Sequence, residues 1–297
     1  GACVLGLSPP CDDQNPCTSD ACDEVADACV NVDLSEIVVN LQVEGLLVPP
    51  AVPSPRTRTV HFVTTDCETG TRTMHDQPIV FTTNPITVSL DNVDLDAEWI
   101  EIVEGHTLSR TLALEFAGCA AVVDATGTSR LLSGDFSNPP WVPQTNRVDI
   151  QDFAILSIYW NTPVDPGLPS RADANGDGVH NVGDFTAIQA NFGDLGDAAG
   201  NCQTFAGSGA AGPWTTSPQL AYEKIAKADL AMVCIPTRAL RLPNANRADC
   251  NNDGWIDLRD MRRFAMRNGL ALTRDMAALI DAYEQIYALP DEPESED

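Results

Sequence analysis

Two twelve-residue stretches carry oxygen-bearing side chains at the spacing that a bound calcium ion requires. Residues 173–184 read Asp-Ala-Asn-Gly-Asp-Gly-Val-His-Asn-Val-Gly-Asp, and residues 249–260 read Asp-Cys-Asn-Asn-Asp-Gly-Trp-Ile-Asp-Leu-Arg-Asp. Calcium takes about six to eight oxygen ligands at roughly 2.3–2.6 Å, and a tight turn at glycine lets alternate residues converge on one point. The two stretches therefore predict two calcium sites.

The predicted ligands occupy loop positions 1, 3, 5, 7, 9 and 12. Position 7 offers a backbone carbonyl, position 9 acts through water, and the acid at position 12 lies in the first turn of a helix, where negative charge is favoured. A metal-free turn rich in Asp, Asn and Gly is the alternative, but two full matches that each run into an amphipathic helix favour calcium. The ligands are Asp173, Asn175, Asp177, Val179, Asn181 and Asp184 in one loop, and Asp249, Asn251, Asp253, Trp255, Asp257 and Asp260 in the other.

A third, incomplete copy lies upstream. Residues 148–153 match the end of such a loop, with Asp149 at position 9 and Asp152 at position 12, but Pro-Gln-Thr-Asn replaces the usual first half. An expanded loop that begins at Asp135 could supply a further oxygen ligand. A third calcium site formed by these three acids therefore stays open.

A loop that closes with Asp, follows a Pro-containing segment and leads into a single helix resembles the dockerin repeat (type I) of secreted bacterial proteins, a relative of the EF-hand. The resemblance covers roughly residues 135–195 and 245–270. It implies that the loops ending at Asp152 and Asp184 pair into one compact unit. The loop ending at Asp260 is expected to dock as an appended half-unit with the helix at Met276–Tyr287.

The resemblance also implies a possible protein partner, since dockerins bind cohesins. Dockerins that do so commonly carry Ser, Thr or similar residues at loop positions 10 and 11. Here these positions hold Ile150-Gln151, Val182-Gly183 and Leu258-Arg259. The departure puts cohesin binding in doubt and leaves the calcium prediction unchanged.

Ten cysteines, an even number, allow up to five disulfides, and half of them lie in the first 29 residues. Such crowding between short polar spacers is typical of a disulfide-stapled module in an oxidising compartment. Zinc is disfavoured because there is no CxxC pair and no nearby His. At least one of the five must pair elsewhere or stay free, and Cys67 and Cys119 are expected partners. The disulfide candidates are Cys3, Cys11, Cys17, Cys22, Cys29, Cys67, Cys119, Cys202, Cys234 and Cys250.

Apolar and polar residues alternate in the stretch after this head, which predicts an antiparallel β-sandwich. Helical spacing of apolar residues replaces the alternation after residue 135. The predicted strands are Glu36–Val43, Thr57–Thr65, Ile79–Thr83, Ile86–Leu90, Trp99–Val103 and Thr111–Phe116. The predicted helices are Phe153–Trp160, Phe185–Phe192, Ala221–Leu230, Met261–Asn268 and Met276–Tyr287.

The predicted fold is therefore multi-domain: a Cys-rich disulfide head, an antiparallel β-sandwich, and α-helical, dockerin-like loop–helix repeats. The boundaries are a head at 1–32, a sandwich at 33–134, a tandem repeat at 135–195, a linker plus helix at 196–235, a third calcium loop with a C-terminal helix at 236–289, and an acidic tail at 290–297. The Gly/Ala/Ser-rich stretch 206–212 is the expected linker, and the tail is expected to be disordered.

Charge and missing motifs narrow the function. With 43 acidic and 17 basic residues the net charge is -26, which repels nucleic acid and anionic membranes. No apolar run is long enough to span a bilayer, and no leader opens the chain, so an already processed form is expected. The cysteines and the calcium loops predict an extracellular or cell-surface location. No catalytic motif occurs. The acids Asp91, Asp94, Asp96 and Glu98 could in principle hydrolyse glycosides, but turn acidity explains them better.

These features predict a non-enzymatic, calcium-binding structural protein that self-assembles into a surface layer or filament. The alternative is an adhesive module in which the β-sandwich binds carbohydrate and the dockerin-like part anchors to another extracellular protein. The order of modules also resembles that of extracellular proteins of planctomycete-type bacteria, a likeness that implies no particular activity.

Overall fold

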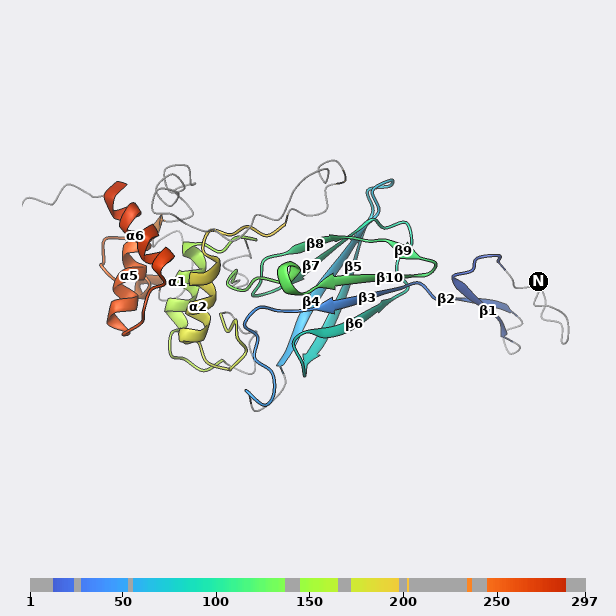
Figure 1. The fold of residues 1–297 in the computed structure, drawn as a ribbon, viewed down its shortest axis with the longest axis horizontal. Coiled ribbons are helices and arrows are strands. Elements are labelled where there is room, and N and C mark those ends of the chain that lie inside the picture. The colour runs from blue at the N-terminus through green and yellow to red at the C-terminus, as the bar shows by residue number, and fades with distance from the viewer. Residues whose placement is uncertain are drawn as a thin grey trace, which may run out of the picture.

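The computed structural model describes residues 13–23, 28–52, 56–136, 145–164, 172–197, 202, 234–236 and 245–286. Figure 1 shows three parts in a row along the long axis of the molecule: a hairpin near the N-terminus, two β-sheets in the middle, and a group of helices at the other end. The predicted helix at Ala221–Leu230, the linker at 206–212 and the acidic tail lie outside the described residues.

Two four-stranded sheets form a β-sandwich, as predicted. The first has the order β6 (Ile86–Asp91), β3 (Glu36–Leu41), β10 (Ala120–Ala125), β9 (Phe116–Ala117). The second has the order β5 (Arg72–Phe81), β4 (Arg56–Thr65), β7 (Trp99–Glu104), β8 (Arg110–Ala113). The prediction of a fully antiparallel sandwich is wrong at one place, because β3 and β10 pair in parallel.

Alternation along the strands builds the core between the sheets. Ile37, Val39 and Leu41 of β3 are completely buried, as are Ile100 and Ile102 of β7, while the residues between them are partly exposed. Burying a Val, Leu or Ile side chain stabilises the fold by roughly 1.5–3 kcal/mol. These side chains form one continuous apolar core with residues of both sheets.

Some predicted strand limits are wrong. Strand β5 begins at Arg72, well before the predicted Ile79, because its first half lies on the exposed edge of the sheet and lacks an apolar pattern. The predicted strand Thr111–Phe116 is divided between β8 and β9, which belong to different sheets. Strand β10 was not predicted, since three of its six residues are alanines.

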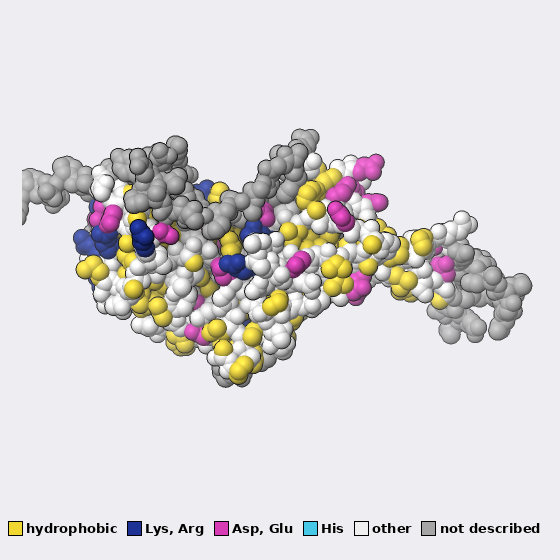
Figure 2. Space-filling model, in the orientation of Figure 1, with side chains coloured by type: hydrophobic (Ala, Val, Ile, Leu, Met, Phe, Trp, Pro, Cys, Tyr) yellow, Lys and Arg dark blue, Asp and Glu magenta, His cyan; other side chains and the backbone are white. Residues whose placement is uncertain are grey.

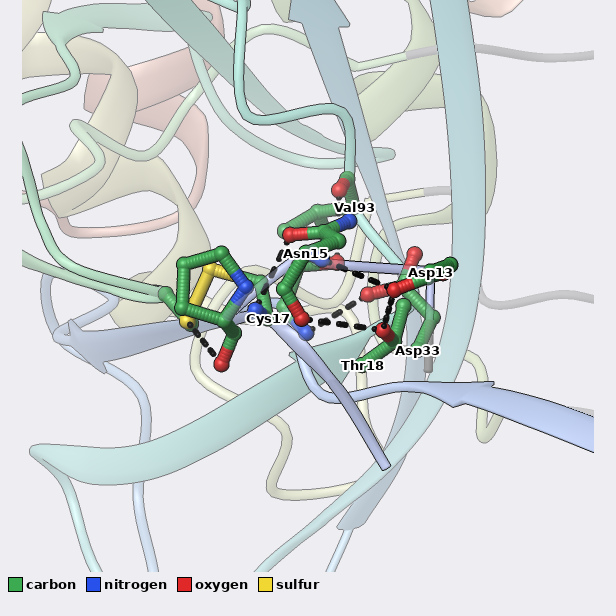
Figure 3. The surroundings of a disulfide bond; sticks show 9 residues. Asp13, Asn15, Cys17, Thr18, Asp33 and Val93 are labelled. Carbon is green, nitrogen blue, oxygen red and sulfur yellow. Dashed lines mark hydrogen bonds between the residues drawn. A yellow bond between two sulfur atoms is a disulfide. The ribbon is translucent and has the colours of Figure 1, made fainter. Parts of the chain in front are cut away.

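The Cys-rich head contains a two-stranded hairpin, β1 (Thr18–Asp23) and β2 (Ala28–Asp33). Side-chain hydrogen bonds brace its base, where Asp13 Oδ1 accepts from the Asn15 N–H at 2.8 Å and from the Thr18 hydroxyl at 2.8 Å (Figure 3). A disulfide from Cys17, also in Figure 3, attaches the hairpin to the sandwich.

The expected Cys67–Cys119 disulfide is wrong. Cys119 pairs with Cys17, and Cys67 pairs with Cys202. Cys119 lies in the turn between β9 and β10, whereas Cys67 follows β4 in the other sheet, so the two cysteines belong to different sheets.

Among the other candidates, Cys29 is disulfide-bonded, and Cys234 and Cys250 are free thiols, which corrects their assignment as disulfide candidates. Cys3, Cys11 and the side chain of Cys22 lie outside the described residues.

The helical part has its own apolar core, built by α1 (Ile150–Tyr159), α2 (Val182–Asn191), α5 (Leu258–Arg267) and α6 (Arg274–Ile286). Aromatic rings from three of these helices meet edge-on at its centre: Phe153 lies 5.3 Å from Phe264 and 6.5 Å from Phe185 between ring centroids. A short ribbon of β11 (Cys234–Pro236) and β12 (Trp255–Asp257), and two 3-10 turns, η1 (Gly127–Ser129) and η3 (Ala245–Arg247), complete the elements. No helix in the described ranges could cross a membrane.

Candidate metal centres

The first turns of α1, α2 and α5 are built in the same way. Each helix begins three residues before its predicted start, because an acid or amide caps it: Asp149, Asn181 and Asp257 respectively. In each case the cap oxygen accepts the N–H two residues on, at 2.7 Å. The acid three residues after the cap completes a capping box, which satisfies N–H groups that a helix start otherwise leaves unpaired.

The acid at loop position 12 ties the two ends of each loop together. Asp184 accepts the N–H of Asn181 at 2.8 Å through one oxygen and that of Asn175 at 3.3 Å through the other. Asp260 likewise accepts from Asp257 at 2.9 Å and from Cys250 at 2.7 Å. The predicted closing residues therefore join the start of each loop to its helix.

The incomplete upstream copy has the same frame. Asp152 accepts the N–H of Asp149 at 2.6 Å and that of Phe136 at 2.6 Å. Phe136 thus takes the place that Cys250 holds at position 2 of the last loop, so Asp135 corresponds to position 1. Asp135 is fully buried. The structure brings together the three acids predicted for a third site, while residues 137–144 of this loop lie outside the described part.

The predicted side chains of loop 173–184 turn into the loop. Asp173 accepts the N–H of Gly178 at 3.0 Å, and Asp177 accepts from Val179 N–H at 2.9 Å and from the Asn181 amide at 2.7 Å. Gly178 has a φ of +90°, which side-chain-bearing residues rarely adopt. The side chains at positions 3, 5 and 9 form one hydrogen-bonded group around Asp177, which also accepts from the Asn175 amide at 3.2 Å, while Asp173 at position 1 bonds the backbone of the turn.

Loop 249–260 repeats this arrangement with one addition. Asp249 accepts the N–H of Gly254 at 3.0 Å, and Asp253 accepts that of Trp255 at 2.9 Å. The guanidinium of Arg259, at position 11, lies 3.1 Å from Asp253 and 2.6 Å from Asp257. Arg259, a side chain of the loop's own helix, therefore neutralises part of the loop's charge, and Asp257 also accepts the hydroxyl of Tyr283 at 3.1 Å.

Burial makes the closing acids costly to ionise. Desolvation, with repulsion from Asp173 and Asp177, raises the pKa of Asp184 to about 7. Desolvation also raises the pKa of Asp260 to about 7, with Asp257 and Asp253 adding to it. The upstream acids behave in the same way. Desolvation raises the pKa of Asp149 to about 6, and desolvation with repulsion from Asp149 and Asp135 raises the pKa of Asp152 well above its ordinary value.

The donor chemistry fits a hard divalent cation. Each full loop offers carboxylate and amide oxygens and a backbone carbonyl, which are the ligands of calcium, and no sulfur or imidazole among the predicted ligands. Across the described ranges, no three side chains of His, Cys, Asp or Glu stand as a ready-formed metal cluster. The loop oxygens are instead hydrogen-bonded to amides within the loop, and several of them would exchange these partners for the ion.

Two arginines of the sandwich hold loop 173–184 and were not predicted as site residues. Arg58 donates to the carbonyls of Asp173 at 2.7 Å and Ala174 at 2.9 Å, and Arg56 donates to the carbonyl of Gly176. Arg58 also forms an ion pair with Glu104 at 3.1 Å. The sequence could have indicated that Arg58 is buried, because it occupies the same strand face as the buried Val60 and Phe62.

Glu104 is an ion-paired acid in the interior. It is almost fully buried and accepts from the ring and the N–H of His106 as well as from Arg58. Desolvation acts to raise its pKa, but Arg58 and His106 outweigh that effect and lower the pKa to about 2.

Loop positions 10 and 11 differ in exposure among the three loops. Ile150 and Leu258, at position 10 of their loops, are fully buried, whereas Val182 is 53% exposed. A Cβ on Gly183, at position 11, would collide with the amide of Asn175. The acids Asp91, Asp94, Asp96 and Glu98 are all exposed, between the last residue of β6 and the start of β7.

No protein-family model matches the chain, and no curated protein is similar to it. Among solved structures, two interface mutants of a type II cohesin–X-dockerin complex from Acetivibrio cellulolyticus are similar to it. Their sequence identities to this chain are 13% and 11%. In both cases the match spans 54% of this chain and 97% of the similar chain, with a TM-score of 0.41. A similarity with this identity and TM-score assigns neither a family nor a partner to this chain.

Proposed function

We propose that this chain is a non-enzymatic extracellular structural protein whose helical part is held in shape by two calcium ions, one in each of the loops 173–184 and 249–260. The observation that carries the proposal is the shared frame of these loops. In each, an acid at position 1 and an acid at position 12 are buried together at the start of a helix, with further oxygens between them.

The ions would be held by the side chains at positions 1, 3, 5 and 12 and by the carbonyl at position 7. A bound calcium ion supplies two positive charges beside carboxylates that burial otherwise penalises. Because α2 and α5 begin inside these loops and their Phe185 and Phe264 rings meet at 6.0 Å, ion binding would stiffen the shared core of the helical part.

Two disulfides support an extracellular location. They join residues 102 and 135 positions apart in the sequence, and such bonds persist in oxidising compartments. A structural rather than catalytic role is favoured because the buried loop acids accept hydrogen bonds from backbone amides of their own loops.

Self-assembly into a layer or filament is favoured by the edges of the sandwich. Strand β5 is a ten-residue edge strand with Met74 63% and Val80 49% exposed. Long edges of this kind can pair with a second chain. Electron microscopy in calcium buffer should show ordered assemblies, and a monodisperse monomer at all concentrations would contradict this part of the proposal.

An adhesive module is the second candidate. Val182 and Trp255 of the calcium loops are exposed, at 53% and 44%, and could contact a protein partner. Capture of one specific cell-surface protein, or of a glycan by the sandwich, in the absence of self-assembly would favour this alternative over the filament.

Calcium titration by isothermal calorimetry tests the metal sites. The chain stripped of metal should bind two calcium ions, and Asp173→Ala and Asp249→Ala should each remove one. Asp94→Ala, which removes an exposed acid on the sandwich, is the matched control and should still bind two. Equal binding by all three variants would show that the loops are not the sites.

A further inference from the structure

A basic face stands out on helix α5 of this acidic protein. Only 17 residues are basic, and six of them lie between residues 247 and 274: Arg247, Arg259, Arg262, Arg263, Arg267 and Arg274. Figure 2 shows Lys and Arg side chains gathered at the helical end of the molecule. A positive patch on a chain of net charge -26 indicates a specific anionic partner rather than a general surface property.

Some arginines of this basic face form no ion pair with acidic side chains of the described residues. Arg259 pairs with Asp253 and Asp257, and Arg262 pairs with Asp281 and Glu284 of α6. Within the described ranges, no ion pair involves Arg247, Arg263 or Arg267, and all three are exposed. Next to them Met266 is 75% exposed, so the outer face of α5 is both basic and apolar.

A pocket of about 290 Å³ adjoins this face. Arg247 and Arg267 line it, together with one acid, Asp249, with Trp160 at the end of α1 and with three asparagines. The buried indole N–H of Trp160 has no hydrogen-bond partner among the described residues. A buried donor left unpaired costs about 1–3 kcal/mol, so the pocket favours a ligand that brings an acceptor oxygen. Two guanidinium groups beside that donor suit a carboxylate.

The chain itself contains a matching segment. Residues 291–297 read Asp-Glu-Pro-Glu-Ser-Glu-Asp, with Leu289 and Pro290 before them. Helix α6 ends at Ile286, and its Asp281 and Glu284 contact Arg262 on α5, so the chain leaves α6 beside the basic helix. Arg267 lies roughly 7–8 Å further along α5, at 1.5 Å per residue. The eleven residues from 287 on can span up to about 35 Å.

We propose that the outer face of α5 (Arg263, Met266 and Arg267), with the adjoining pocket, binds the acidic C-terminal segment of the same chain, residues 291–297. The carboxylates pair with the arginines, and Leu289 and Pro290 cover Met266. The tail thereby shields this face of α5 from other anionic partners. A second copy or an outside acidic protein could supply the same chemistry, and the experiment separates these sources.

A competition experiment with the full chain tests the proposal. A neutral-tail variant carries Asp291→Asn, Glu292→Gln, Glu294→Gln, Glu296→Gln and Asp297→Asn. A fluorescent peptide of residues 287–297 should bind this variant at low salt and bind the native chain at least about tenfold more weakly, since a tethered tail competes at roughly millimolar effective concentration. The affinity should fall as salt rises.

Substitutions on the basic face complete the test. Adding Arg263→Ala and Arg267→Ala to the neutral-tail variant should weaken the peptide at least about tenfold, and both are exposed helix positions where alanine is tolerated. Adding Arg72→Ala, which removes a positive charge on the sandwich, should change little. Equal binding by the native and neutral-tail chains, or by the α5 variant, would overturn the proposal. So would a native dimer that the neutral tail converts to a monomer, because the tail would then bind a second copy.

Discussion

The sandwich and the loop–helix part bury acidic side chains in opposite ways. In the sandwich, Glu104 lies between Arg58 and His106, both within hydrogen-bond distance. In the loop–helix part, Asp184 lies near Asp173 and Asp177, and Asp260 lies near Asp253 and Asp257. One region therefore contains the counter-charge for its buried acid, and the other groups acids with acids.

The difference follows from the cost of burying charge. An ion removed from water is strongly destabilised unless an opposite charge and hydrogen bonds replace the solvent. The sandwich meets this requirement at Glu104 with its own arginine and histidine, so this buried acid needs no ion from solution. The loops meet it only in part, with backbone N–H groups and Arg259, and we infer that calcium completes the compensation.

Removal of calcium should give the largest contrast between the two regions. An ion bound only by the folded state stabilises it by about 4 kcal/mol per site when free calcium is a thousandfold above the dissociation constant. Amide hydrogen exchange with and without EDTA should show loss of protection in α1, α2, α5 and α6 and little change in β3, β4 and β7. Amide protection of the helices that is the same with and without EDTA would contradict this difference between the two regions.

Glu104→Gln should destabilise the sandwich by about 3–5 kcal/mol, because it leaves the buried Arg58 without its anion. The matched control is Glu101→Gln on the same strand, which removes a partner of the half-exposed Arg72 and should cost less than about 1 kcal/mol. Chemical denaturation in calcium buffer measures both. Since Arg58 also holds Asp173 and Ala174, exchange in loop 173–184 should rise in the Glu104 variant only.

Acid should weaken the sandwich over a defined range. The pKa of Glu104 is about 2 in the folded protein against 4.5 as its ordinary value, so its contribution is complete above about pH 4.5 and is lost as the pH falls toward 2. A difference of this size corresponds to about 3 kcal/mol. Exchange in β4 and β7, followed from pH 5 to pH 2.5, should show this loss in the native chain. A native chain whose acid dependence equals that of Glu104→Gln would contradict the assignment.

The upstream acids give the smallest expected effect. Asp135→Asn removes repulsion from the buried Asp152 without removing the hydrogen-bonded frame of its loop. If this loop is held by hydrogen bonds alone, the change in unfolding free energy should stay within about 1 kcal/mol, and the calcium stoichiometry should remain two. A loss of one bound ion would instead make the upstream loop a third site.

The periodic parts of this molecule could be predicted from sequence. Alternating Ile37, Val39 and Leu41 predicts β3, and the twelve-residue spacing predicts that Asp184, in the first turn of α2, returns to the beginning of its loop, where it accepts the N–H of Asn175. Both follow from local geometry, in which a side chain's direction is set by its position along the element. The residues at loop position 9 also cap their helices through local hydrogen bonds. This role could have been predicted from sequence, but these residues were predicted only as calcium ligands.

Long-range partners could not be predicted. Nothing in the spacing of Cys67 distinguishes Cys119 from Cys202, since pairing depends on how the segments cross in space. The parallel pairing of β10 with β3 was missed because alanine-rich strands lack an apolar pattern. Arg58 shows an intermediate case: its place on a buried strand face indicated an interior charge, but the contact with loop 173–184 required the fold.

A crystal structure grown in calcium, with an anomalous difference map, tests the central claim most directly. The account predicts one strong peak inside each of the loops 173–184 and 249–260, with oxygens of positions 1, 3, 5, 7 and 12 at about 2.3–2.6 Å. A well-ordered map with no peak in either loop, and with their carboxylates still bonded to backbone amides, would contradict it.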